Sequence, residues 1–448
     1  MKRTQRIATC LVGAFIGVMG LTQPAAAESN YRCSGLEQNR ELPSIEGRDG
    51  VFFRINADLR MNHPFSDQTV AYLAELSQAL ADHGTTLIYV PIPTKSVTMP
   101  DHLPDAAPLY GFDLEIATHV HDDILKRLTA AGVVTVDARP AMMQAPNDDL
   151  AFFKADFHWS ASGAREAARA IADVIRVQPG YDELTKTTYE TTPQDVEIAF
   201  SGMRRLLQTH CLDTLPEAET MTYETTQSGE VDLGGGLDLF GDSTDAIPVA
   251  LAGTSFSDSP INNFPGFIAE YAELEVINYA ITGGNQYGAM ISYLTSVEFQ
   301  EARPKFLIWE NPIYNNLAQF GDQPMRELIA AAGRSCTTEI PVQVADGLDE
   351  LSVDLSGYGL GPEDTLLVDT NRSLGLTADF EFHSAAGLTR TKTIVRGERL
   401  TRTGRFYMPL SGLWPEGAAS VTVSMDRPFS SAPTVYVCHS TSPRKEDS

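Results

Sequence analysis

Apolar segments typical of buried strands alternate with amphipathic segments typical of helices up to about residue 333 of this 448-residue chain. Strands are predicted at 86–91, 133–137, 247–252, 274–281 and 305–310. Helices are predicted at 66–83, 114–132, 160–172, 286–299 and 324–333. This alternation predicts an α/β domain with a mostly parallel sheet. The segment 178–245 is polar and threonine-rich, which predicts a long insertion across one face of the domain.

A different pattern begins near Cys336. Short apolar or alternating runs are separated by Gly, Asn and Ser and lack helical periodicity: 351–355, 378–382, 392–395, 406–409, 421–425 and 435–438. Such runs predict an all-β sandwich. We therefore expect the α/β domain to span 28–333, the sandwich to span 334–442, and a disordered charged tail to follow at 443–448.

The N-terminus has the organisation of a secretory signal peptide. Lys2, Arg3 and Arg6 precede a largely apolar run at 7–21, and Ala25-Ala26-Ala27 offers a cleavage site. We expect residues 1–27 to be removed on export. The remaining sequence has no further run of about 18 apolar residues, so the exported chain is expected to be soluble.

Four cysteines remain after removal of the segment that contains Cys10. An even number in an exported chain predicts disulfides, and four cysteines allow three pairings. The spacing favours Cys33–Cys211 and Cys336–Cys438, because each pair then closes one domain; free buried thiols are the alternative. The sequence has no Cys-x-x-Cys pair, so a structural zinc site is not expected.

An acid–base pair is predicted at Asp156-Phe157-His158. In extended backbone, residues two apart point to the same side, so the carboxylate can orient the imidazole and stabilise its protonated form. The alanine-rich helix that follows would be capped by Ser160 or Ser162, which places the pair at a loop-to-helix junction. The pair is weak evidence by itself and requires a nucleophile elsewhere.

Ser255 is the predicted nucleophile. It follows a buried strand and Gly253, and sites in parallel sheets form at the carboxyl ends of strands. Joined with His158 and Asp156, it gives a Ser-His-Asp set. The alternative is that Ser255 only begins a helix or turn. Ser243, in Gly241-Asp242-Ser243, is less favoured because it precedes its strand and would lie at the wrong end of the sheet.

Five short segments together resemble the SGNH-hydrolase-like domain of the alginate O-acetyltransferases of the AlgX/AlgJ family. They are Pro91-Ile92-Pro93-Thr94-Lys95-Ser96, Asp156-x-His158-Trp159, Gly253-Thr254-Ser255-Phe256-Ser257, Gly283-Gly284-Asn285 and Trp309-Glu310. The resemblance covers about residues 30–330. The C-terminal part resembles the carbohydrate-binding module of the AlgX type, and the favoured disulfide pairing also fits that type.

The resemblance implies a fold related to SGNH hydrolases with the motifs in a different order, because Asp and His precede Ser here. It implies that Ser255 is the nucleophile, His158 the general base and Asp156 its orienting partner. It implies oxyanion or substrate contacts at Gly283, Gly284 and Asn285. Tyr314 either lines the same pocket or is an ordinary packing tyrosine.

The implied activity is transfer of an acetyl group through a serine ester onto hydroxyls of an exported polysaccharide, such as alginate or a similar anionic polymer, in the periplasm. Export separates the enzyme from acetyl-CoA, so the implied partners are an acetyl donor protein or membrane-bound acetyl relay and the machinery of polysaccharide synthesis or export. A carbohydrate acetylesterase and a non-catalytic polysaccharide-binding scaffold remain alternatives.

The chain is strongly acidic, with a formal net charge of −26, which disfavours nucleic acid as a partner. An anionic polymer would therefore need a local basic patch. Such a patch is predicted at Arg390, Lys392, Arg396 and Arg399, with Trp414 stacking on a sugar ring. The alternatives are a solvated, charge-guarded strand edge and a core tryptophan.

His119 and His121 lie near Asp122 and Asp123, in a combination that metal sites use. On a helix, however, residues two positions apart point in different directions, so a solvated face is predicted there. We expect neither a metal nor a cofactor.

Overall fold

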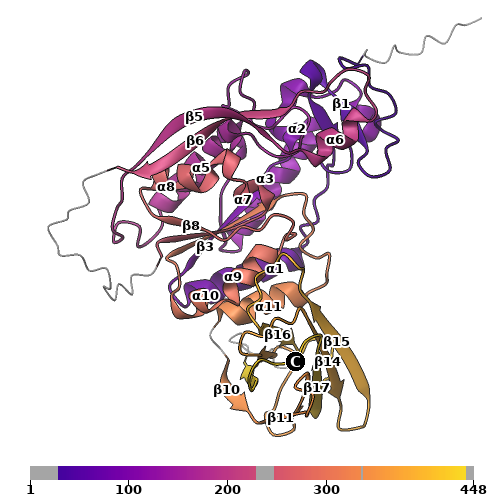
Figure 1. The fold of residues 1–448 in the computed structure, drawn as a ribbon, viewed down its shortest axis with the longest axis vertical. Helices are drawn as coiled ribbons and strands as arrows, with labels where there is room; N and C mark the ends of the chain where they lie inside the picture. The colour runs from indigo at the N-terminus through magenta and orange to yellow at the C-terminus, as the bar shows by residue number, and fades with distance from the viewer. Residues whose placement is uncertain (1–28, 229–246, 334–335, 440–448) are drawn as a thin grey trace, which may run out of the picture.

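The computed structural model describes residues 29–228, 247–333 and 336–439 (Figure 1). Three sequence predictions lie outside these residues. They are the signal peptide at 1–27, the less favoured Ser243 and the charged tail at 443–448.

A five-stranded parallel sheet forms the centre of the first domain. Its order is β4 (Val134–Thr135), β3 (Thr86–Ile92), β9 (Phe306–Pro312), β7 (Val249–Ala252) and β8 (Val276–Asn278). The predicted α/β class is confirmed. The last strand in sequence, β9, occupies the middle of the sheet, between β3 and β7.

Helices cover both faces of this sheet, because successive side chains of each strand point to opposite faces. On β3, Ile88 points into one core and Tyr89 into the other. The first core is covered by α5 (Ala161–Arg176) and α8 (Phe264–Ala272). The second is covered by α1 (Asp67–Ala81), α9 (Gly288–Leu294) and α11 (Gln323–Ala332) (Figure 1).

A further group of regular elements in this domain is shorter or lies at its edge. They are β1 (Ser44–Glu46), β2 (Phe52–Arg54), α2 (Lys95–Thr98), α3 (Leu114–Ala130), α4 (Arg139–Met142), and 3-10 turns at Arg48–Gly50, Pro100–His102, Ala107–Tyr110 and Pro260–Asn262.

The prediction of a single helix at 286–299 is wrong, because the structure has two helices in this region. The chain ends α9 at Leu294 and begins α10 (Val297–Glu301) three residues later. The Thr295 hydroxyl donates to the Ile291 carbonyl, and Ser296 caps α10 by accepting from the Phe299 N–H. These side-chain hydrogen bonds compete with continuation of the helix.

The segment predicted as an insertion contains an antiparallel β-hairpin. Strands β5 (Tyr189–Ala199) and β6 (Ala218–Gln227) pair with each other, and α6 (Gly202–Gln208) lies between them in sequence. In Figure 1 the hairpin lies above α5 and α8, on the side of the domain away from the C-terminal module. Most β5 side chains are exposed, so the strand lacks the apolar alternation that predicts one.

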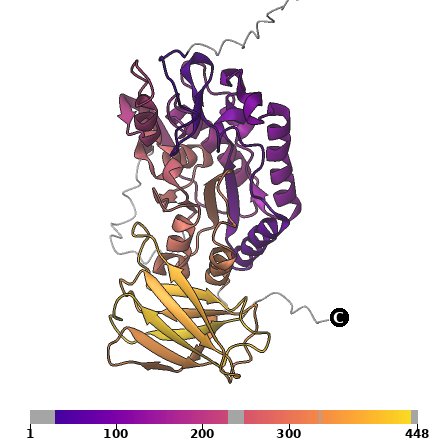
Figure 2. The same ribbon diagram turned by 90° about the vertical axis from the view of Figure 1, so that its right-hand side faces the viewer.

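The C-terminal region is a sandwich of two antiparallel sheets, as predicted (Figure 2). One sheet contains β10 (Cys336–Ile340), β18 (Thr434–Cys438), β13 (Thr365–Asp369) and β16 (Arg405–Pro409). The other contains β11 (Val342–Val344), β12 (Glu350–Asp354), β17 (Ser420–Met425), β14 (Thr377–His383) and β15 (Thr389–Val395). Aliphatic and aromatic side chains from both sheets form one core.

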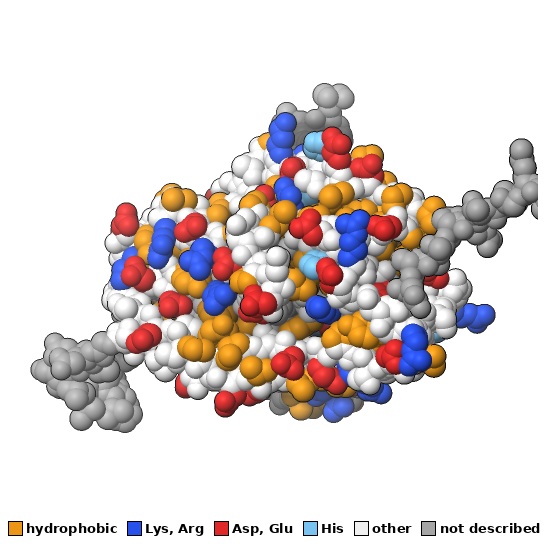
Figure 3. All heavy atoms as spheres, turned by 90° about the horizontal axis from the view of Figure 1, so that it is seen from above, with side chains coloured by type: hydrophobic (Ala, Val, Ile, Leu, Met, Phe, Trp, Pro, Cys, Tyr) orange, Lys and Arg blue, Asp and Glu red, His pale blue; other side chains and the backbone are white. Residues whose placement is uncertain are grey.

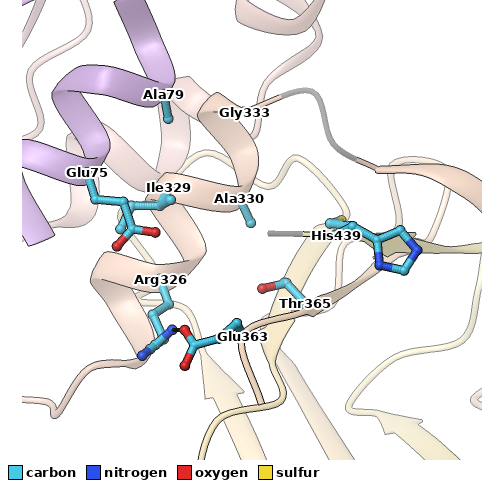
Figure 4. Close-up of a pocket in the computed structure, with 10 residues that line it drawn as sticks. Glu75, Ala79, Arg326, Ile329, Ala330, Gly333, Glu363, Thr365 and His439 are labelled. Carbon is cyan, nitrogen blue, oxygen red and sulfur yellow. Dashed lines mark hydrogen bonds and ion pairs between the residues drawn. The ribbon is translucent and has the colours of Figure 1, made fainter. Parts of the chain in front are cut away.

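The module packs beneath α11. Its Leu367 and Tyr407 join the second core of the α/β domain. Ion pairs connect the two parts: Arg396 with Glu327, and Arg326 with Glu363 at 2.9 Å. The second pair borders a small cavity of about 40 Å³ at the junction (Figure 4).

Both predicted disulfides are present. Cys33 is joined to Cys211 in the first domain, and Cys336 to Cys438 links neighbouring strands of the module. Among the described residues, none of the helices combines the length and apolarity that a bilayer span requires.

Candidate active site

The acid and base lie on a tight turn between α4 and α5. Phe152 and Trp159 form an antiparallel bridge, and the Phe153 N–H donates to the His158 carbonyl at 3.2 Å. Within this turn, Asp156 Oδ1 accepts from the His158 backbone N–H at 2.7 Å and lies 2.6 Å from His158 Nδ1. The carboxylate therefore fixes both the position and the tautomer of the imidazole.

Asp156 is buried, and its second oxygen accepts a hydrogen bond from the Ser201 hydroxyl. Ser201 also caps α6. Burial alone raises the pKa of Asp156, but the hydrogen bonds from His158 and Ser201 outweigh it, and the pKa lies below its usual value. Asp156 is thus ionised at neutral pH and can stabilise a protonated imidazole.

Ser255 is the first residue of the short helix α7 (Ser255–Asp258), just beyond the end of β7. Its Oγ lies 2.8 Å from His158 Nε2. A continuous hydrogen-bonded series therefore runs from Asp156 through His158 to Ser255. Ser160 caps α5, as one of the two predicted caps.

A second contact joins the acid–base turn to the nucleophile turn. The buried Trp159 donates from Nε1 to the Phe256 carbonyl at 2.8 Å, and its ring packs edge-on against Phe256. Neighbouring residues of both turns are thus connected in parallel: His158 with Ser255, and Trp159 with Phe256. This arrangement limits relative movement of the base and the nucleophile.

Lys95 supports the acid–base turn from α2, and its role was missed by the sequence analysis. The side chain is buried, and its ammonium donates to four backbone carbonyls: Phe52, Phe153, Lys154 and Asp156, at 2.6–3.0 Å. The signal was available, because a charged residue follows an otherwise apolar strand within the segment 91–96.

Arg54 connects Tyr314 to this turn. Its guanidinium lies 4.5 Å from the ring centre of Phe157 and 4.6 Å from that of Tyr314. Asp58 accepts hydrogen bonds from Arg54 Nε and Nη2, at 3.0 and 2.8 Å. Burial raises the pKa of Tyr314 above its usual value. Tyr314 is thus connected to Phe157 of the acid–base turn through Arg54, and its place in the substrate pocket stays a prediction.

The loop that contains Gly283, Gly284 and Asn285 lies beside the nucleophile turn. The Ile281 N–H donates to the Gly253 carbonyl at 3.1 Å, and the Thr282 N–H donates to Asp258 Oδ2 at 2.8 Å. Asn285 Oδ1 accepts from the Tyr287 N–H in its own turn. The loop is thus tied to both ends of α7, while the oxyanion donors predicted there remain a prediction.

A family model described as "SGNH hydrolase-like domain, acetyltransferase AlgX" matches residues 45–313, which is more than half of the chain. The chain belongs to this family. Alginate biosynthesis protein AlgX of Pseudomonas aeruginosa is 31% identical over 297 residues, which cover 66% of this chain and 61% of that protein. AlgX of Azotobacter vinelandii is 30% identical, over 70% of this chain and 63% of the relative. The alignments thus span less than two thirds of these two relatives.

A protein named probable alginate O-acetylase AlgJ, from Pseudomonas aeruginosa, is 28% identical over 64% of this chain and 77% of its own length. Two solved structures share the fold. Pseudomonas aeruginosa AlgX has a TM-score of 0.74 at 22% identity, covering 92% of this chain and 98% of that one. The O-acetyltransferase domain of Pseudomonas putida AlgJ has a TM-score of 0.51 at 23% identity, and the match covers 65% of this chain and 99% of that domain.

The basic residues predicted as a patch do not form one exposed surface in this AlgX-family chain. Arg396 is buried in its ion pair with Glu327, and Trp414 is buried in the sandwich core, so their predicted exposure is wrong. Lys392 donates to the Pro409 and Ser411 carbonyls. Arg390 lies over the Trp414 ring at 5.1 Å.

Arg399, like Arg396, reaches the α/β domain, and its side chain is exposed. Its Nη1 donates to the Thr282 carbonyl at 3.2 Å, and its Cδ lies close to Gly283. Lys392, Arg396 and Asn285 line a cavity of about 570 Å³ between the module and the α/β domain. At the opposite end of the molecule, acidic and basic side chains are interspersed rather than gathered by sign (Figure 3).

The predicted solvated face at His119 and His121 is wrong for His121. Its side chain is buried, and Nε2 lies 3.2 Å from Asp137 Oδ1, which follows β4. Together with Asp122, these two residues place three candidate ligand atoms within 4.8 Å of one another. Arg139 pairs with Asp122 at 3.5 Å and supplies positive charge to the same group.

Proposed function

We propose that this chain is a periplasmic O-acetyltransferase that moves an acetyl group through an ester of Ser255 onto hydroxyls of an exported polysaccharide. The series Asp156–His158–Ser255 carries this proposal, because it joins an ionised carboxylate, an imidazole and a serine hydroxyl at hydrogen-bond distances. Family membership and the names of the AlgX and AlgJ relatives support acetylation of alginate or a similar anionic polymer.

In the first half-reaction, His158 Nε2 takes the proton of Ser255 while Oγ attacks the acetyl carbonyl of the donor. The tetrahedral intermediate collapses to the acetyl-serine as the bond to the donor breaks, and the imidazolium gives its proton to the donor's leaving group. In the second half-reaction, His158 takes the proton of a sugar hydroxyl, whose oxygen attacks the acetyl carbonyl. The bond to Ser255 Oγ then breaks, and Oγ regains the proton.

Asp156 acts through His158, because its carboxylate holds Nδ1 and leaves Nε2 directed at Ser255. The signal segment and two disulfides support an oxidising compartment outside the cytoplasm. The donor is then an acetyl-carrying protein or membrane-bound relay, and the acceptor chain comes from the synthesis or export machinery. Arg399 is the patch residue that we expect to contact an anionic chain near the junction of the two domains, because its side chain is exposed there and reaches the Thr282 carbonyl.

An acetyl-ester assay with and without a uronic-acid oligosaccharide tests the function. Wild type should acetylate the oligosaccharide, detected by mass spectrometry, and Ser255→Ala should lower turnover by at least about 1,000-fold. Release of acetate to water alone, with no transfer, would identify an esterase. Oligosaccharide binding without any turnover would identify a scaffold.

A further inference from the structure

A buried carboxyl group lies directly beneath the nucleophile turn. Glu310 belongs to the central strand β9, pairs with Val90 of β3, and is fully buried. The chain places an ionisable side chain here among apolar strands, where desolvation disfavours its charged form. Packing alone gives no reason for such a residue, since an apolar side chain of similar size would fill the same space.

The contacts of Glu310 are all directed at the residues that flank Ser255. Its Oε2 accepts from the Thr254 N–H at 2.7 Å and from the Ser257 hydroxyl at 2.9 Å. The Thr254 hydroxyl lies 3.1 Å from both carboxyl oxygens. One side chain therefore holds the residue before Ser255 and the residue two positions after it.

Gly253 allows this close approach. A Cβ atom at this position would lie 2.5 Å from Glu310 Oε2 and 2.7 Å from the Ser257 Oγ. Both distances are far below van der Waals contact, so a larger residue would displace the carboxyl group from the turn. The glycine in the motif Gly253-Thr254-Ser255 is thus explained by Glu310, fifty-odd residues away in sequence.

We propose that Glu310 is a positioning residue for acyl transfer, which holds the Thr254–Ser257 turn so that Ser255 Oγ stays within reach of His158 Nε2. The proposal rests on the proposed function for its reaction, but not for its geometry. Since a displacement of about 1 Å costs about 100-fold in rate, the absence of this support should be visible in turnover.

The charge of Glu310 adds a second, pH-dependent effect. Burial raises the pKa of Glu310 to about 7, and its electrostatic neighbours are His158, Tyr89 on β3 and Tyr314 after β9. Above this pKa the carboxylate stabilises the protonated form of His158, which is the form that follows proton abstraction from Ser255. Below it, Oε2 of the neutral acid still accepts from the Thr254 N–H and the Ser257 hydroxyl, while the protonated Oε1 can donate to the Thr254 hydroxyl.

Two substitutions separate these effects. In Glu310→Gln, the amide oxygen can take the place of Oε2, and its NH₂ can donate to the Thr254 hydroxyl, so the turn keeps its support without a charge. In Glu310→Met, the Thr254 N–H and the Ser257 hydroxyl lose their acceptor. The matched control is Glu327→Gln, which changes another fully buried glutamate of the same domain that pairs with Arg396 instead.

The experiment measures two rates for each variant: acetyl-ester turnover, and covalent labelling of Ser255 by a sulfonyl fluoride. Glu310→Met should lower kcat and the labelling rate by about 100-fold with KM within about twofold, while Glu327→Gln changes neither rate. Glu310→Gln should recover to within about tenfold of wild type, and its kcat/KM should rise at a lower pH than in wild type, because no carboxylate then stabilises protonated His158.

Wild-type rates in Glu310→Met would overturn the proposal, as would a Glu310→Gln variant as slow as Glu310→Met with an unchanged pH profile. If circular dichroism shows that Glu310→Met does not fold, the labelling rates of Ser257→Ala and Glu310→Gln test the proposal instead. Ser257→Ala should then be slower than wild type, and a wild-type rate in it would overturn the proposal. Labelling of wild-type Ser255 without acetyl transfer would refute the proposed function and still leave the role of Glu310 measurable.

Discussion

The ion pair between Arg396 and Glu327 makes a strong prediction about stability. Glu327 is fully buried on α11, and the Arg396 side chain is only 9% exposed. Arg396 contacts both carboxylate oxygens, with Nη1 at 2.9 Å from Oε2. Gln323 also donates to Oε2, at 2.9 Å. Arg396→Met would leave a buried carboxylate without its cation.

Removing one partner of a buried pair costs about 3–5 kcal/mol, because the remaining charge is uncompensated. Arg396→Met should therefore destabilise the protein by about that amount. The double variant Arg396→Met, Glu327→Gln should recover at least about 2 kcal/mol of this loss, since the amide is neutral and can still accept from Gln323. The two substitutions are thus strongly non-additive.

Urea unfolding followed by tryptophan fluorescence measures the stability loss in Arg396→Met and its recovery in the double variant, as shifts in the unfolding midpoint at constant m-value. One outcome of these measurements would refute the stability argument. If Arg396→Met lies within about 1 kcal/mol of wild type and instead weakens oligosaccharide binding, then Arg396 is a polymer contact rather than a buried structural charge, and the stability argument is refuted.

Three further predictions follow from the site and the disulfides. Lys95→Met removes the donor of four carbonyls and should lower both stability and kcat. Lys154→Met, at a half-buried lysine whose ammonium donates to the single carbonyl of Asp49, should leave kcat within about twofold in the same assay. The lowered pKa of Asp156 means that its contribution to stability is present above about pH 4 and lost as pH falls further, so Asp156→Asn should flatten the acid limb of a denaturation curve measured against pH. Replacing Cys336 and Cys438 by serine opens a loop of 102 residues and should cost about 4–5 kcal/mol in unfolding experiments, while added reductant should lower the stability of this variant only through the remaining Cys33–Cys211 bond.

Local patterns predicted much of the α/β domain and of the reacting groups. Residues close to one another in sequence determine the apolar strands, the amphipathic helices and the cap at Ser160. Asp156 and His158 are two residues apart, and Ser255 follows a buried strand directly, so each half of the site has a local signal. Each reacting group could therefore be predicted from its own neighbours, whereas the contact between His158 and Ser255 joins positions 97 residues apart and has no local signal.

Burial of charged residues could not be predicted, because it depends on partners far away in sequence. Burial of the Arg396 side chain depends on its ion pair with Glu327, 69 residues earlier. Burial of His121 likewise depends on its contact with Asp137, which follows β4. The hairpin of β5 and β6 was missed because its strands pair with each other and β5 exposes most of its side chains. Polar, exposed strands lack the alternation on which strand prediction depends.

The position of β9 also determines when the site can form during folding. Asp156, His158 and Ser255 all precede residue 306, yet β9 lies between β3 and β7 and carries Glu310 beneath the nucleophile turn. Until β9 inserts, the strand that supports the acid–base turn and the strand that leads to the serine have no common neighbour. The contacts that assemble the site are thus among the least local in the domain, which slows folding. The first 300 residues therefore contain every reacting group but lack the strand that lies between β3 and β7 and carries Glu310.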